Sequence, residues 1–207
     1  MITIVHCGIG NIQSVLNALG SLGHAAAVAE TPADLAGADR IILPGVGSFR
    51  QSAEKLRADG WKDALDELVL GRKLPVLGIC LGMQLIAEWG DEHGGAAGLG
   101  WIEGRVQLIP RTTTDLRLPH VGWNDIEILR DSPLFQGLGD ERSAYFVHSF
   151  QFVTSRDEDR AAVTDYGRPV TAAVAKGNVF GVQFHPEKSH RVGLAILDNF
   201  ARMQGPC

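Results

Sequence analysis

The first ninety residues alternate apolar runs with helix-like segments, and this alternation restricts the folds that the chain can adopt. Four apolar runs have the length of buried strands, and they lie at 2–7, 24–29, 40–45 and 74–79. Helical spacing of apolar residues follows, in the segments 12–22, 48–58, 61–70 and 81–89. Strands that alternate with helices of this length need right-handed crossovers. We therefore expect an α/β fold with a mostly parallel sheet that helices cover on both faces.

The second half of the chain has a different pattern. A glycine-rich loop at 94–100 precedes six short strand-like segments, which read RVQLI, GWNDIEI, AYFVHSFQF, RAAVTDY, PVTAAVA and VFGVQF. Turns separate these segments, so we expect antiparallel strands here. A closing helix is predicted at 192–203. Because the chain has neither an internal repeat nor a proline-rich linker, we expect one domain over residues 1–207.

The composition excludes several classes of function. The chain is 45% hydrophobic and 21% charged with a net charge of -5, and its basic residues are scattered. A nucleic-acid partner needs a basic stripe and a membrane span needs a longer apolar stretch, so we expect neither. The three cysteines, Cys7, Cys80 and Cys207, are far apart, which favours a reducing cytoplasm over a disulfide framework. The histidines lack metal-ligand spacing and a G-x-G after the first strand lacks its third glycine, so we expect no metal and no cofactor.

Cys80 lies between two glycines in the motif Gly78-x-Cys80-x-Gly82, the thiol form of the G-x-S-x-G nucleophile elbow. In such an elbow a strand turns at once into a helix, which strains the backbone at the nucleophile and requires small neighbours. The free N–H groups at the helix start favour a thiolate, and the Leu81 N–H is placed to bind an oxyanion. The motif is short, so a buried structural cysteine is the alternative interpretation.

A base for this thiol is offered by His185 and Glu187, which only Pro186 separates. In extended backbone, residues two apart project to the same face. Proline fixes its own φ and disfavours the α conformation for the residue before it. We therefore expect extended backbone here, with Glu187 holding one imidazole nitrogen while the other faces Cys80. A nucleophile, a base and a group that orients the base form the arrangement of cysteine hydrolases.

Together with LPGVGSF at 43–49, these motifs resemble the class I (triad) glutamine amidotransferase family over nearly the whole chain. The resemblance implies a three-layer, flavodoxin-like α/β fold. It also implies that Cys80 attacks the side-chain amide of glutamine, that His185 protonates the departing ammonia and that Glu187 orients His185. An N–H of Val46 or Gly47 would join that of Leu81 in binding the oxyanion.

Five blocks are similar to one branch of that family, the glutaminase subunits of imidazole glycerol phosphate synthase. In chain order they read PGVGSF, GICLGMQ, PHVGWN, YFVHSF and FHPEKS. By this similarity, L-glutamine would be held by Gln84, Glu92, His148, Ser149 and Phe150. The resemblance also implies a heterodimer with a (β/α)8 synthase (cyclase) subunit, which would receive the ammonia. That partner would face Asn11, Trp123, Asn124, Tyr145 and Lys188.

Two departures from the family pattern leave alternatives open. His6-Cys7 stands where Asp-Tyr is usual, and Phe150 stands where a tyrosine closes the block. The first departure lies near the expected partner surface, so a paralogue that supplies ammonia for nucleotide-sugar amidation in surface-polysaccharide synthesis is one alternative. Another cysteine hydrolase of similar fold and a catalytically inactive binding module are the others.

Overall fold

The computed structural model describes residues 1–8, 10–111 and 116–203. Its larger sheet has nine strands among these residues. They are β1 (Ile2–Val5), β2 (Ala26–Ala29), β3 (Arg40–Gly45), β4 (Val76–Cys80), β8 (His120–Ile128), β9 (Ser143–His148), β11 (Arg160–Asp165), β12 (Pro169–Lys176) and β13 (Val179–Val182). A second sheet contains β5 (Ala87–Gly90), β6 (Ala96–Ala97), β7 (Ile102–Leu108) and β10 (Phe150–Thr154).

Five α-helices flank the sheets in the described part of the chain: α1 (Ile12–Ser21), α2 (Phe49–Ala58), α3 (Trp61–Asp66), α4 (Leu81–Leu85) and α5 (His190–Arg202). A π-helical turn follows α3 at Glu67–Gly71. Short 3₁₀ turns lie at Pro32–Gly37, Glu92–Gly94, Pro133–Phe135, Asp157–Asp159 and Pro186–Lys188.

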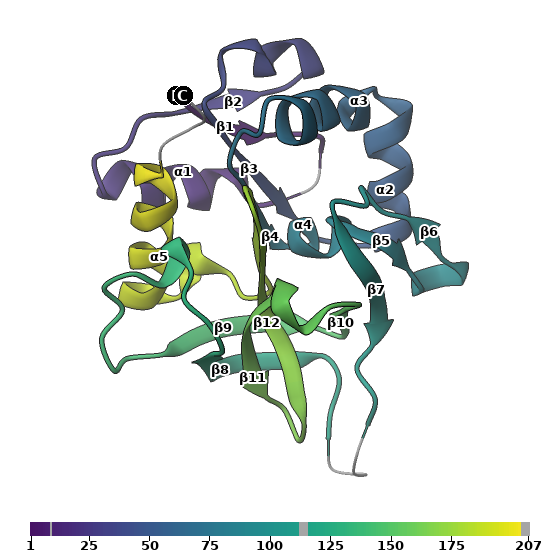
Figure 1. Cartoon of the computed structure of the whole chain (residues 1–207), viewed down its shortest axis with the longest axis vertical. Helices are drawn as coiled ribbons and strands as arrows, with labels where there is room; N and C mark the ends of the chain where they lie inside the picture. The colour runs from purple at the N-terminus through teal and green to yellow at the C-terminus, as the bar shows by residue number, and fades with distance from the viewer. Residues whose placement is uncertain (9, 112–115, 204–207) are drawn as a thin grey trace.

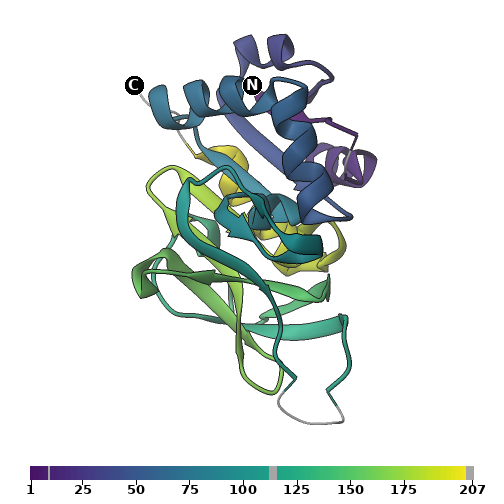
Figure 2. The ribbon, with the colours of Figure 1, turned by 90° about the vertical axis from the view of Figure 1, so that its right-hand side faces the viewer.

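The larger sheet is parallel in one half and antiparallel in the other. Its strand order is β2-β1-β3-β4-β13-β12-β11-β8-β9, and the strands from β2 to β13 pair in parallel. The pairs from β13 to β9 are antiparallel. Figure 2 shows the antiparallel strands in the lower part of the molecule, away from the helices α2 and α3. The last strand-like segment of the sequence, VFGVQF, therefore lies beside the strand that ends at Cys80.

Two hydrophobic clusters cover opposite faces of the parallel strands. On one face, Phe49, Leu56 and Trp61 of α2 and α3 belong to the same cluster as Ile41 and Leu43 of β3. On the other face, residues of α1 and α5 share a cluster with Ile42 and Leu77. Figure 1 shows the helix pairs α1–α5 and α2–α3 on opposite sides of β3 and β4. The expected three-layer α/β fold is confirmed.

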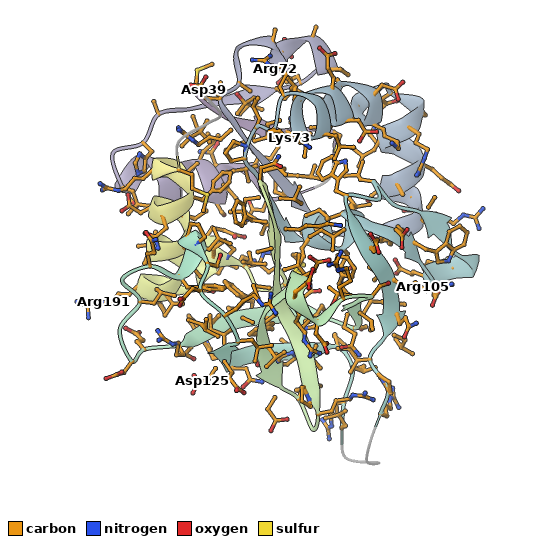
Figure 3. The ribbon with its side chains drawn as sticks, in the orientation of Figure 1. Asp39, Arg72, Lys73, Arg105, Asp125 and Arg191 are labelled. Carbon is orange, nitrogen blue, oxygen red and sulfur yellow. The ribbon has the colours of Figure 1, made fainter. Side chains whose placement is uncertain are left out.

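Charged side chains lie at the periphery of this fold. Figure 3 labels six of them, all exposed: Asp39, Arg72, Lys73, Arg105, Asp125 and Arg191. Arg105 lies on β7, Asp125 on β8 and Arg191 on α5, whereas Asp39, Arg72 and Lys73 lie in loops.

The structure corrects the expected helix at 81–89. The helix ends at Leu85, and Ala87–Gly90 forms β5, which pairs with β6 and β7. The carbonyls of Leu85, Ile86 and Ala87 accept N–H groups from residues 99–102 instead of continuing a helix. These tertiary hydrogen bonds override the helical spacing of the apolar side chains.

The expected strand AYFVHSFQF is also divided. Residues up to His148 belong to β9 in the larger sheet, whereas Phe150 begins β10 in the second sheet. Ser149 joins the two strands. The chain therefore passes from one sheet to the other beside the end of β4, within the stretch that the sequence assigns to glutamine.

Candidate active site

Cys80 lies on a strained turn between β4 and α4. Its φ is 54° and its ψ is -110°, a region that non-glycine residues rarely adopt. A Cβ at position 82 would lie 1.8 Å from the Leu43 carbonyl oxygen, and one at position 78 would lie 2.6 Å from the Gly82 oxygen. Only glycine fits at these two positions. The predicted strand–turn–helix elbow is confirmed.

The pairing of β13 with β4 brings the histidine segment to this turn. The two strands are parallel, with Val182 opposite Ile79, so the residues that follow each strand emerge at the same edge of the sheet. His185 Nδ1 is 2.8 Å from Glu187 Oε1, and the side chains of His185 and Glu187 are only 4% and 2% exposed. The structure thus brings together the pair that the sequence predicts.

The backbone of this segment differs from the expected extended geometry. His185 itself is extended, with φ -95° and ψ 98°, but Pro186–Lys188 forms a 3₁₀ turn. Proline suits the first position of such a turn because its φ is already fixed and its missing N–H is not needed there. The Ser189 hydroxyl donates to the His185 carbonyl, and the Tyr145 N–H donates to the Ser189 oxygen. The turn, rather than an extended strand, therefore places Glu187 against His185.

The free edge of the His185 ring faces the thiol. In the part of the chain that the structure describes, buried Nε2 has no hydrogen-bond partner. Burial lowers the pKa of His185, but the Cys80 side chain and the Glu187 carboxylate outweigh it and raise the pKa to about 9. His185 is therefore protonated at neutral pH, which suits it to pair with a thiolate and to donate a proton.

The expected oxyanion loop begins beside the elbow. Gly45, the last residue of β3, pairs with Cys80, and a Cβ on it would lie 2.9 Å from the Gly82 nitrogen. Val46 and Gly47 follow directly and are both exposed, whereas Leu81 is buried in the elbow. Gly47 has φ +103°, a conformation that favours glycine. This placement puts the backbone of both segments next to Cys80, and their oxyanion role stays a prediction.

Comparison with known proteins decides the family. The sequence profile of the glutamine amidotransferase class-I family matches residues 3–203. The chain belongs to the class-I glutamine amidotransferase family.

Curated relatives and solved structures agree with this assignment. The amidotransferase is 45% identical over 203 residues to imidazole glycerol phosphate synthase subunit HisH 1 of Campylobacter jejuni (strain 81-176), covering 98% of this chain and all of the relative. It is 47% identical to subunit HisH of Symbiobacterium thermophilum, covering 98% and 93%. A solved glutamine amidotransferase has a TM-score of 0.74 at 22% identity, covering 96% of this chain and 98% of that one. The structure of PurLQS from Thermotoga maritima has a TM-score of 0.71 at 19% identity, covering 96% of each chain; at these identities the structures show the fold.

The residues predicted to hold glutamine already have partners within the amidotransferase. Gln84 Nε2 donates to the Phe150 carbonyl and to Gln183 Oε1. Glu92 Oε2 accepts the Phe49 N–H at the start of α2. The His148 ring contacts the same Phe150 carbonyl at 2.7 Å through Nδ1. Gln84 and His148 thus meet at the Phe150 carbonyl, whereas Glu92 is bound to the start of α2. The contact of these side chains with glutamine stays a prediction.

The main-chain carbonyl of Ser149 accepts the Ile109 N–H. Ser149 is partly exposed and lies where the chain passes between the two sheets. The stretch 148–150, which the sequence assigns to glutamine, is therefore held by its backbone.

Three of the residues predicted to face a partner lie together. Trp123 is 48% exposed, stacks on His190 at 4.7 Å and meets the Tyr145 ring edge-on at 6.0 Å. Lys188 Nζ lies 5.9 Å from the centre of the Tyr145 ring. We call Trp123, Tyr145, Lys188 and His190 the aromatic patch.

The other two predicted partner residues lie differently. Asn124 belongs to the opposite face of β8 and donates to the Asp165 carbonyl at 2.7 Å. Asn11 caps α1 through Ser14, and Ser14 lines a groove together with Lys188 and His190. The structure therefore places Asn11 beside the aromatic patch and separates Asn124 from it.

Sequence reasoning missed two polar residues of the site. Gln183 is fully buried and its Nε2 lies 3.8 Å from Cys80 Sγ. His120 is buried and its Nδ1 lies 3.1 Å from His148 Nε2. The signal for Gln183 is its position two residues before His185, at the end of an otherwise apolar strand.

Neither a metal centre nor a membrane-spanning helix is found in the described ranges 1–8, 10–111 and 116–203. No group of three or more His, Cys, Asp or Glu side chains there could hold a metal ion. No helix there is both long and apolar enough to cross a membrane. Of the three cysteines, Cys207 lies outside the described residues.

Proposed function

We propose that this amidotransferase is the glutaminase subunit of an imidazole glycerol phosphate synthase, acting in histidine biosynthesis. The observation that carries the proposal is the buried His185–Glu187 contact of 2.8 Å beside a cysteine on a strained elbow. Relatives of 45% and 47% identity over nearly the whole chain bear the name of this subunit, which favours it over the nucleotide-sugar paralogue. A cytoplasmic location, expected from the cysteine content, stays a prediction.

The mechanism uses the three residues in turn. The Cys80 thiolate attacks the side-chain amide carbon of glutamine, and N–H groups of Leu81 and of Val46 or Gly47 bind the oxyanion. His185, protonated at neutral pH because its pKa is raised to about 9, donates its proton to the departing ammonia. It then takes a proton from the water that hydrolyses the thioester, and glutamate leaves. Glu187 holds the ring in the required orientation throughout.

A synthase partner follows from the fate of the product. Released into water at neutral pH, most ammonia becomes ammonium, which is not a nucleophile. We propose a heterodimer in which a (β/α)8 cyclase subunit covers the aromatic patch and takes up the ammonia. Val121, Trp123 and Val147 of β8 and β9 are 56%, 48% and 37% exposed, an apolar surface suited to a protein partner.

Glutamate release from glutamine tests the catalytic part of the proposal. Cys80→Ala should reduce release to the uncatalysed background, because the nucleophile is gone. Cys7→Ala removes the other buried cysteine of the described chain and should leave release unchanged. Continued hydrolysis by Cys80→Ala would refute the thioester mechanism.

Mixing the chain with the cyclase subunit from the same genome tests the partner. We expect a 1:1 complex by size-exclusion chromatography and glutamine hydrolysis that rises when the cyclase substrate is bound. Trp123→Ala should weaken the complex by about tenfold or more, because aromatic anchors carry much of an interface's binding free energy. Leu70→Ala is the control, because Leu70 is another exposed apolar residue and lies in the turn that follows α3; α3 lies at the opposite end of the molecule from β8 and β9 (Figure 1). Full hydrolysis without any cyclase would contradict the expected activation.

A further inference from the structure

Two buried histidines near the site have no part in the proposed mechanism. His120 and His148 are 3% and 6% exposed and lie opposite each other in the register of β8 and β9. Their rings are 3.1 Å apart from Nδ1 of His120 to Nε2 of His148. Nδ1 of His148 contacts the Phe150 carbonyl at 2.7 Å, and Nε2 of His120 lies 3.3 Å from Asn124 Nδ2.

These three contacts allow one arrangement of protons. A carbonyl oxygen only accepts, so His148 Nδ1 carries a proton and donates to Phe150. Burial lowers the pKa of both histidines to about 4, so each ring is neutral at neutral pH and has one N–H. His148 Nε2 must then accept from His120 Nδ1, and His120 Nε2 must accept from the Asn124 amide. All donors point from Asn124 toward the Phe150 carbonyl.

The same carbonyl fixes two glutamine side chains. Gln84 must present its Nε2 to the Phe150 oxygen, which lies 3.1 Å away, and its second N–H meets Gln183 Oε1 at 3.0 Å. If the Gln183 amide were reversed, its N–H would face the N–H of Gln84, and neither donor would have an acceptor there, which is unfavourable in a buried site. Gln183 therefore turns its own Nε2 toward Cys80 Sγ, at 3.8 Å.

We propose that Gln183 is a positioning residue for the Cys80 sulfur, with its amide oriented by Gln84, whose own amide is oriented by the Phe150 carbonyl. The histidine pair donates to the same carbonyl through His148 and holds it in place. An N–H directed at the sulfur stabilises the thiolate, whereas a carbonyl oxygen there would repel it. The inference rests on the proposed function only in taking Cys80 as the nucleophile. Gln183 can reach the Cys80 sulfur because it directly follows β13, which pairs with the strand β4 that ends at Cys80.

The pH dependence of Cys80 alkylation in the full-length chain measures this effect. The probe is iodoacetamide, and mass spectrometry follows the Cys80 peptide separately from the other cysteines. Gln183→Met removes the donor at similar volume and should raise the midpoint of the profile by about one pH unit, because the thiolate loses a charge-assisted hydrogen bond. His185, the titratable group that faces the sulfur, and Glu187 on the other side of its ring are present in every variant compared. An unchanged midpoint would overturn the inference.

A double substitution tests whether Gln84 acts through Gln183. Gln84→Met should raise the midpoint in the same direction by a smaller amount. If the hydrogen bond from Gln84 orients the Gln183 amide, the double variant Gln84→Met/Gln183→Met should match Gln183→Met alone. Additive shifts would show that the two side chains act independently, and they would refute the orientation of Gln183 by Gln84.

Controls separate positioning from a general loss of structure. Gln151→Met replaces another buried glutamine, 6% exposed on β10, and should leave the midpoint unchanged. If circular dichroism shows that Gln183→Met does not fold, Gln183→Ala decides, since it removes the same N–H donor without adding a charge and should also raise the midpoint. The assay needs neither glutamine nor a partner. An unchanged midpoint with glutamine hydrolysis by the wild type in the presence of the cyclase and its substrate would refute this inference alone. A raised midpoint without wild-type hydrolysis under those same conditions would refute the proposed function alone.

Discussion

His185 and the His120–His148 pair are buried to a similar extent, yet their pKa values shift in opposite directions. The three side chains belong to residues that are 3% to 6% exposed. The pKa of His185 is raised to about 9, while those of His120 and His148 are lowered to about 4. Burial opposes the charged ring in all three cases and is the largest single influence on each.

The partners of the rings account for the difference. His185 lies between the Glu187 carboxylate and the Cys80 thiol, both of which favour a positive ring. The hydrogen-bond partners of His120 and His148 are uncharged: each other's ring, a backbone carbonyl and an asparagine amide. Phe146 and Tyr166 stack on His120, and the positive charge of His185 lowers the pKa of His148 further. The comparison teaches that charge at the partner, rather than depth of burial, decides which histidine is the acid and which are structural.

Removing the Glu187 carboxylate beside His185 should have the largest effect. Glu187→Gln keeps the shape but withdraws the negative charge, so the pKa of His185 should fall and the ring should lose its orientation. We expect glutamine hydrolysis to fall by about 100-fold or more, since general acid–base catalysis contributes about 10²–10⁴-fold. Steady-state glutamate release measures the rate, and an NMR titration of His185 measures its pKa.

Glu103→Gln is the matched control for this substitution. Glu103 is an exposed carboxylate on β7 whose Oε1 lies 3.6 Å from Lys176 Nζ, away from the elbow. Its replacement should leave both the rate and the His185 titration unchanged. A rate for Glu187→Gln within fivefold of the wild type would mean that the carboxylate does not support His185.

The opposite shifts also predict the dependence of stability on pH. The unfolded histidines titrate near 6.5. Between this value and the folded pKa of His185, about 9, the folded state binds more protons, so stability falls as pH rises. Between 6.5 and about 4 the unfolded state binds more protons, so stability falls as pH drops. The free energy of unfolding should therefore be greatest near pH 6.5. The histidines should cost on the order of 3 kcal/mol above this pH, where one ring titrates, and on the order of 3 kcal/mol per ring below it, where two rings titrate.

Urea unfolding at a series of pH values distinguishes the two sites. Glu187→Gln should flatten the decline above pH 6.5 and leave the acid side unchanged. His148→Gln should make the acid decline shallower, because one of the two coupled rings no longer takes up a proton on unfolding. If both substitutions altered the same side of the curve, the assignment of the two sites would be wrong.

How much of these sites the sequence predicts depends on the distance along the chain. The elbow spans residues 78–82 and the acid–base pair spans 185–187, so local spacing points to both. The cysteine motif alone leaves a buried structural cysteine as the alternative, and the second motif favours the nucleophile. The Cys80–Gln183 contact depends on β13 pairing in parallel with β4, across about a hundred residues. Local periodicity reports which side of a strand is buried but not which strand lies next to it.

The errors in the fold have the same origin. The helix expected at 81–89 stops at Leu85 because carbonyls at 85–87 bond to residues 99–102. The strand expected through Ser149 divides because the chain changes sheets there. The His120–His148 contact likewise follows from the register of β8 and β9. In each case a partner distant in sequence decides the local structure, and neither composition nor spacing names that partner.

Placing a carboxylate beside the His120–His148 pair should give the smallest change in pKa, and it is the most direct test of the comparison. Asn124→Asp places a negative charge beside His120 Nε2, where the amide nitrogen now lies at 3.3 Å. If the charge of the partner sets the direction, the pKa of His120 should rise from about 4 by about one unit, measured by NMR titration of the ring. Asn124→Ala, which removes the amide without adding charge, should not raise the pKa of His120.

The neighbouring carboxylate of Asp125 does not affect this comparison. Asp125 is exposed and donates its own N–H to the Asn124 side chain, and it is present in both variants. A His120 pKa that stays near its present value in Asn124→Asp would mean that burial alone governs this ring, and the explanation given for His185 would then need a cause other than Glu187.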